Sequence, residues 1–117
     1  MAVLDDLDDR ALDALPFGVV CLDDQMTVVR MNRVESEASG IQRWRAIGRD
    51  FFRDVAPGPT NVALAQQVRA FAGDSSTPCR SSQPIRHTFK RRSGSDTATI
   101  ELVQGARKDR VYLCIRR

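Results

Sequence analysis

Near the start of the chain, hydrophobic residues recur at the three- and four-residue spacing of an amphipathic helix. In residues 3–15 aspartates occupy the opposite side of the helix, and the acidic first turns suit the helix dipole. The apolar stripe consists of Val3, Leu4, Leu7, Ala11, Leu12 and Leu15. A stripe this narrow has to dock on another element. We therefore expect residues 1–15 to form a cap helix that Pro16 ends, and residues 16–117 to form the main domain.

Five short runs carry the alternating or β-branched pattern of strands. They are residues 17–22, 26–31, 85–91, 98–104 and 110–116. The first two are separated by the polar turn Asp23–Gln25, which predicts a β-hairpin. A second turn is expected at residues 93–96, where Ser, Gly and Asp cluster.

Between the second and third runs the pattern predicts several short helices and one longer one. They are residues 33–39, 41–46, 48–55 and 61–72. Gly40 and Gly73 are good C-terminal stops, and Thr60 or Asn61 can cap the longest helix. The order predicts an α+β domain with the short helices on one face of a five-stranded sheet.

The other face of that sheet needs cover, because it carries Val103, Tyr112 and Cys114. The N-terminal helix, through Leu4 and Leu7, is one candidate for this cover, and a second subunit is the other. These five residues are the interface residues that we expect.

The length of 117 residues fits one domain with a core of its own. No apolar run is long enough to span a bilayer, and the acidic N-terminus lacks the order of a signal peptide. Three widely spaced cysteines without a CxxC motif favour reduced thiols. We therefore expect a soluble, cytoplasmic protein without membrane contact.

The net charge of +3 hides an asymmetry. Residues 1–15 hold five Asp and one Arg, whereas residues 80–117 hold ten Lys or Arg against three acidic residues. A basic face can attract nucleic acid or an acidic protein surface. No predicted helix concentrates these cations, so we favour a solvated sheet face, and nucleic acid is not the expected partner.

Two strings of sequence carry a family resemblance. FGVVCLDDQMTVVRMN (residues 17–32) and GRDFFRDVAP (residues 48–57), followed by the terminal strand, resemble the photoactive yellow protein branch of the PAS family. The resemblance covers about residues 10–117. It implies an antiparallel sheet of order 2-1-5-4-3 and the role of a sensor.

The family's chemistry carries over only in part. The resemblance places the cysteine that holds a hydroxycinnamoyl chromophore at Gly58, which has no nucleophile, so thioester attachment there is impossible. It places a chromophore-binding tyrosine at Met31, and a shielding arginine at Ile41. It places the pocket glutamate at Glu35 and a nearby threonine at Ser39.

Glu35 is the sharpest candidate for a ligand contact. Buried in a pocket, it would favour the neutral acid and donate a hydrogen bond to a ligand oxygen. The alternative is a solvated helix face near Arg33 or Arg30.

His87 shares a strand face with Ile85 and Phe89, so it is expected to face the helices. It could ligate haem iron, but a core histidine that hydrogen-bonds the backbone or a Ser or Thr side chain is the preferred interpretation. The remaining lining candidates are Phe52, Val55 and Phe89. At their spacing, the phenylalanines and Met31 are more often plain core.

Enzyme chemistry has no basis in this sequence. It lacks a paired nucleophile and base, a metal-ligand cluster and a phosphate-cradling glycine loop. We expect a non-enzymatic sensor that lacks a covalent chromophore and signals through another protein or a homodimer. A non-covalent small ligand is an option, and no cofactor is expected. The alternatives are a ligand-free dimerisation module and a haem sensor that uses His87.

Overall fold

A computed structural model describes residues 4, 7–56, 61–73, 81–82, 84–91, 94–104 and 110–117. The elements begin with α1 (Asp9–Asp13), β1 (Gly18–Leu22), β2 (Val28–Met31), α2 (Arg33–Ser39) and α3 (Arg43–Ala46). A π-helical turn, η2 (Phe51–Val55), then precedes α4 (Val62–Gly73), β3 (Ile85–Arg91), β4 (Gly94–Gln104) and β5 (Val111–Arg116). None of the described helices is long and apolar enough to cross a lipid bilayer.

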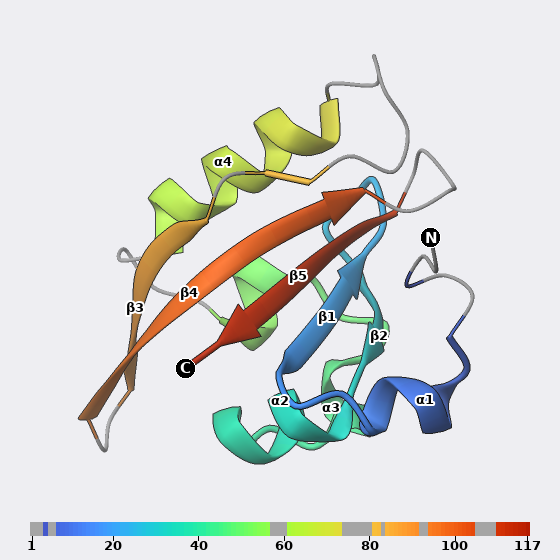
Figure 1. The fold of residues 1–117 in the computed structure, drawn as a ribbon. Helices are drawn as coiled ribbons and strands as arrows, with labels where there is room; N and C mark the ends of the chain where they lie inside the picture. The colour runs from blue at the N-terminus through green and yellow to red at the C-terminus, as the bar shows by residue number, and fades with distance from the viewer. Residues whose placement is uncertain are drawn as a thin grey trace.

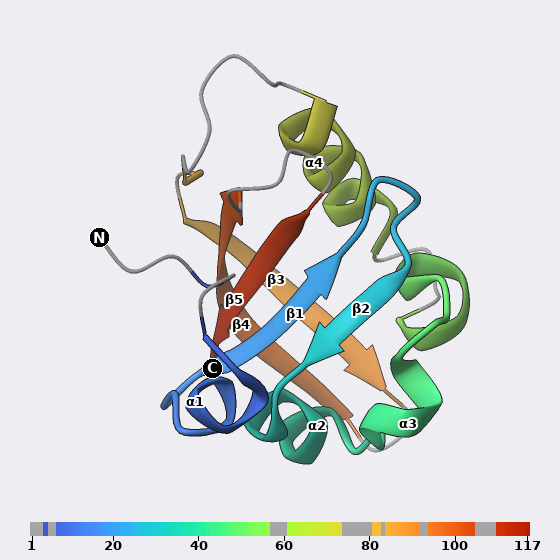
Figure 2. The same cartoon turned by 90° about the vertical axis from the view of Figure 1, so that its right-hand side faces the viewer.

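The five strands form one antiparallel sheet in the order β2-β1-β5-β4-β3, as predicted (Figure 1). β5 lies in the middle, where Leu113 is opposite Val20 of β1 and Leu102 of β4. Figure 2 shows α1, α2 and α3 at one end of the sheet and α4 at the other. The first and last strands of the chain are therefore neighbours, which brings residues near 18 and 117 together.

Alternating side chains divide the core between the two faces of the sheet. Leu113, Val20 and Leu102 belong to the inner cluster with Phe51 and Val68 of the helical layer. The outer cluster consists of Leu12, Val19, Cys21 and Tyr112, with Leu4, Leu7, Leu15, Phe17, Val29 and Val103 packed against it. The described residues of the N-terminal segment thus cover part of the outer face, which is one of the two alternatives that the sequence left open.

The cap helix is shorter than predicted. A helix was expected over residues 3–15, but α1 runs only from Asp9 to Asp13. Asp8 adopts an extended conformation, and its carboxylate accepts a hydrogen bond from Ala11 N at 2.8 Å, so it caps the helix at that point. Leu4 and Leu7 still reach the outer cluster.

The β3–β4 hairpin also differs from the prediction. A turn was expected at residues 93–96, but β4 already begins at Gly94, which pairs with Arg91, and Asp96 pairs with Phe89. Strand pairing satisfies the backbone N–H and C=O groups of these residues, and this outweighs their turn-like composition.

Candidate functional site

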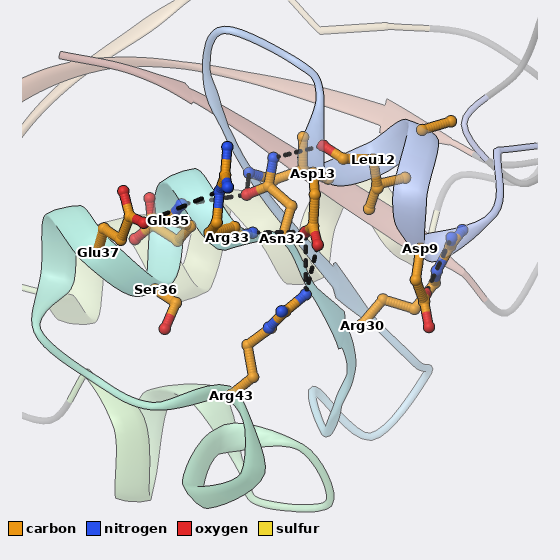
Figure 3. A network of polar contacts seen from close by, with 12 residues as sticks. Asp9, Leu12, Asp13, Arg30, Asn32, Arg33, Glu35, Ser36, Glu37 and Arg43 are labelled. Carbon is orange, nitrogen blue, oxygen red and sulfur yellow. Dashed lines mark hydrogen bonds and ion pairs between the residues drawn. The ribbon is translucent and has the colours of Figure 1, made fainter.

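Asn32 is a fully buried amide at the junction of the cap, the sheet and α2 (Figure 3). Its Oδ1 accepts hydrogen bonds from Val19 N at 2.9 Å and from Glu35 N at 3.1 Å. Its Nδ2 donates to Leu12 O at 2.9 Å and to Phe17 O at 3.0 Å. One side chain therefore caps α2 and holds both the C-terminal part of α1 and the chain that leads into β1.

Asp13 makes a second link between the cap and the short helices. Its Oδ1 accepts a hydrogen bond from Arg33 N at 2.7 Å, at the first turn of α2. Arg43 of α3 donates to both carboxylate oxygens, at 2.9 and 3.1 Å (Figure 3). Both bonds come from one nitrogen, Nη1, and both side chains are partly exposed, so this ion pair contributes more to the placement of α1 against α3 than to the stability of the fold.

Arg30 of β2 holds the segment that precedes α1. Its guanidinium donates to Leu4 O at 3.2 Å, to Leu7 O at 2.5 Å and to the Tyr112 hydroxyl at 3.1 Å. Asp9 lies 3.6 Å away on the exposed side. The backbone carbonyls of Leu4 and Leu7 are thus tied to a single cation on the sheet.

Glu35 is buried on α2, with only 5% of its side chain exposed. Arg117 donates to both of its oxygens, at 2.6 and 3.3 Å, and also to Asp96 Oδ2 at 3.3 Å. A guanidinium beside a carboxylate favours its charged form. Glu35 therefore accepts hydrogen bonds here, in contrast to the donating neutral acid that the sequence suggested.

The surroundings of Glu35 are closely fitted to it. A Cβ atom added at Gly18 would lie 2.3 Å from Glu35 Oε1 and 3.1 Å from its Cβ, so only glycine leaves room for this side chain. The Arg117 guanidinium lies 5.6 Å from the ring centroid of Phe89. Beside it is a surface hollow of about 400 Å³, with Gly18, Val34 and Arg117 in its lining.

The other predicted lining residues fall into two groups. Met31 is buried in the inner cluster, and Phe52, Val55 and Phe89 are partly buried against it. Ser39 instead lies at the end of α2, where its Oγ accepts from Ile41 N at 3.3 Å. Gly58 lies outside the described residues.

His87 is engaged by a neighbouring amide. Its Nε2 lies 2.6 Å from Asn61 Oδ1, and Asn61 Nδ2 donates to Ala56 O at 2.8 Å. Because Asn61 Oδ1 is an acceptor, Nε2 carries the proton. The imidazole packs edge-on against Phe89, and burial lowers the pKa of His87. Iron binding at Nε2 would require this hydrogen bond to break.

The predicted interface residues gather on the outer face. Tyr112 and Cys114 are 1% and 4% exposed, and Leu4, Leu7 and Val103 are partly buried in the outer cluster. Burial raises the pKa of Cys114 to about 11. A second subunit could contact this face only where the N-terminal segment does not cover it.

Within the described part of the chain, no three His, Cys, Asp or Glu side chains are placed to hold a metal ion.

Sequence reasoning missed the residues that connect these groups, namely Asn32 as a buried hub, Arg30, Asp13 and Arg117. Asn32 carried a signal, because an asparagine between a strand and a helix is a good N-cap. Arg117 carried none, because its contact with Glu35 joins residues 82 positions apart.

Comparison with known sequences gives the family. Residues 12–106 match the family model described as PAS fold. The photoactive yellow protein of Rhodothalassium salexigens is 38% identical over 52 residues, which are 44% of this chain and 42% of that protein. The photoactive yellow protein of Rhodobacter capsulatus is 40% identical over 45 residues, which are 38% of this chain and 36% of that protein. Each match spans less than half of the curated relative.

Solved structures extend the similarity over most of the chain. The photoactive yellow protein domain of the sensor histidine kinase Ppr from Rhodospirillum centenum superposes with a TM-score of 0.83 at 28% identity, covering 97% of this chain and 96% of that one. The PAS domain of the Cronobacter turicensis quorum-sensing receptor RpfR, solved in complex with BDSF, gives 0.69 at 19% identity, covering 87% and 93%, and supports the fold alone. The chain belongs to the PAS family and is a PAS sensor domain related to photoactive yellow protein.

Proposed function

We propose that this PAS domain signals through protein–protein contacts by changing how its N-terminal segment docks on the sheet. The observation that carries the proposal is the position of Asn32, which hydrogen-bonds both the helix of Glu35 and the cap. A sensor of this kind needs a site whose state changes and a surface that responds. Here the side chain of Asn32 connects the site around Glu35 directly to the N-terminal segment that covers the outer face.

The proposed input is the ion pair of Glu35 and Arg117. Loss of that pair, through a ligand or through protonation, would leave an unpaired group at a buried position and would shift α2. Because Asn32 caps α2 and also holds Leu12 O, movement of α2 weakens the docking of α1. The outer face around Tyr112 would then become available to a partner.

The proposed ligand is non-covalent. Glycine at position 58, directly after the VAP sequence, offers no atom for thioester attachment of a chromophore. A PAS domain of the same fold has been solved with the ligand BDSF, which supports small-molecule binding as an option for this scaffold. The Gly18–Glu35–Arg117 region, with its adjoining hollow, is the place we propose for it.

Exposure of Cys21 tests the coupling directly, because this thiol is fully buried in the outer cluster beneath the cap. In a Cys79→Ser, Cys114→Ser background, Cys21 can be alkylated only when the cap opens. We expect Glu35→Gln to raise the native-state alkylation rate about tenfold, which corresponds to about 1.4 kcal/mol of opening free energy. Leu64→Val on α4 is the control, a substitution in the inner core.

The Cys21 alkylation rates of Glu35→Gln and Leu64→Val are compared under conditions in which the two variants have the same free energy of unfolding, as measured by urea unfolding. If Cys21 in both variants is labelled only as fast as global unfolding allows, Glu35 is not coupled to the cap and the proposal fails. Native mass spectrometry and an absorption spectrum of the same sample separate the rivals. A mass above that of the chain indicates a ligand, a Soret band indicates haem, and a dimer with a docked cap indicates an interaction module.

A further inference from the structure

The tryptophan of α3 projects into solvent. Trp44 is 71% exposed, although its neighbour Ala46 on the same short helix is fully buried. Ile47, the next residue after α3, is 47% exposed. Large apolar side chains that cluster at the surface mark interaction sites more often than single scattered ones do.

Two arginines, Arg45 and Arg49, lie on the same surface as this tryptophan. In the described ranges, no ion pair involves either of them, whereas Arg43 of the same helix is paired with Asp13. The Arg45 guanidinium lies 5.2 Å from the Trp44 ring centroid, which keeps both groups at the surface together. Tryptophan and arginine are the residue types most enriched at the centres of protein interfaces.

A hollow of about 570 Å³ lies beside them. Ile41, Val55 and Trp44 supply its apolar lining, and Arg45, Arg49 and Asp54 its charged lining. The segment that carries it is held rigidly, because Arg49 O accepts from Val28 N at 2.9 Å and Gly48 N donates to Val28 O at 2.8 Å. Strand β2 at the edge of the sheet therefore supports this surface, which we name the Trp44 surface.

We propose that the Trp44 surface binds a partner protein that presents acidic residues around an apolar side chain. The apolar side chain enters the hollow beside Ile41 and Trp44, and the acidic residues pair with Arg45 and Arg49. The charges favour this partner, because two unneutralised guanidinium groups line the hollow against one carboxylate, that of Asp54. The surface is separate from the Asn32 network, so the inference does not rest on the proposed function.

Two other classes of partner fit less well. A phosphate backbone would be repelled by Asp54 in the lining and would leave the hollow unfilled. An anionic membrane would receive Trp44 but presents no single side chain to fill a concave site. Both become arms of the test.

Trp44 is the one tryptophan of the chain, so its fluorescence reports this surface alone. The probe is the tryptophan-free peptide acetyl-Asp-Glu-Leu-Phe-Glu-Asp-amide, and its control replaces Leu-Phe by Gly-Ser. We expect the probe to shift the Trp44 emission to shorter wavelength with saturation below about 1 mM, and the control peptide to bind at least about tenfold more weakly. Arg45→Glu with Arg49→Glu is expected to abolish the shift, and Arg86→Glu on β3 to preserve it.

Several outcomes overturn the proposal. An unchanged Trp44 emission at about 1 mM probe does so, as does an equal response to both peptides. A stronger response to duplex DNA or to phosphatidylglycerol vesicles reassigns the surface. If the emission instead shifts with protein concentration alone and sedimentation shows a dimer, the occupant is a second copy and the proposal is wrong.

Discussion

Replacing Asn32 with alanine removes four hydrogen bonds that join the cap, β1 and α2. Three of them lie in fully buried surroundings, and a buried group left without a partner costs about 1–3 kcal/mol. Part of that cost is offset because the amide itself is no longer buried. We therefore expect Asn32→Ala to lower the free energy of unfolding by about 2–4 kcal/mol, a large part of the stability of a small domain.

Asn32→Asp separates the two roles of this side chain. Aspartate keeps the oxygen that accepts from Val19 N and Glu35 N, but it replaces the donor that faces Leu12 O and Phe17 O with a second acceptor. We expect the introduced aspartate to keep the N-cap of α2 while the N-terminal segment loosens from the sheet. Cys21 should then be alkylated faster in this variant than global unfolding predicts.

Urea unfolding, followed by far-UV circular dichroism, measures the first effect, and Cys21 alkylation measures the second. Gln66→Ala on the exposed side of α4 is the control, with an expected change within about 0.5 kcal/mol. A loss below about 1 kcal/mol in Asn32→Ala would refute the reasoning, because a buried hub with four bonds cannot be replaced at so small a cost.

Three further predictions follow from the same contacts. Gly18→Ala should lower the free energy of unfolding by about 1–3 kcal/mol in urea titrations, because its Cβ would overlap Glu35, and Glu35→Ala should relieve much of that loss; equal losses in both backgrounds would contradict the overlap. Because burial lowers the pKa of His87 from 6.5, the unfolded chain binds the proton first, so stability is full above pH 6.5 and falls as the pH drops below it. Urea titrations should show this slope in the parent and not in His87→Gln. With the pKa of Cys114 raised to about 11, its alkylation at about pH 8 in a Cys21→Ser, Cys79→Ser variant should require urea, and native labelling at the rate of an exposed thiol would show that the outer face is open.

Local pattern was enough to predict most of the fold. Alternation along residues 85–91, 98–104 and 110–116 predicted three strands that the structure contains, and Gly40 ends α2 with φ of 74° in the left-handed region. The errors occurred at element ends. Asp8 caps the N-terminus of α1, so the helix begins later than predicted, and Gly94 already belongs to β4, because a cap or a pairing partner decides an end that periodicity leaves open.

Of the residues in the candidate site, sequence reasoning singled out Glu35 and missed those that connect it to the cap and to the end of the chain. The sequence by itself determined that an acid at Glu35 follows an N-capping Asn32, and that an amphipathic N-terminal segment needs a surface to cover. Only the tertiary structure decided that Asn32 hydrogen-bonds the N-terminal segment and that Arg117 forms an ion pair with Glu35. The physical reason is that β1 and β5 pair side by side, so groups at opposite ends of the chain meet at distances that no local spacing encodes.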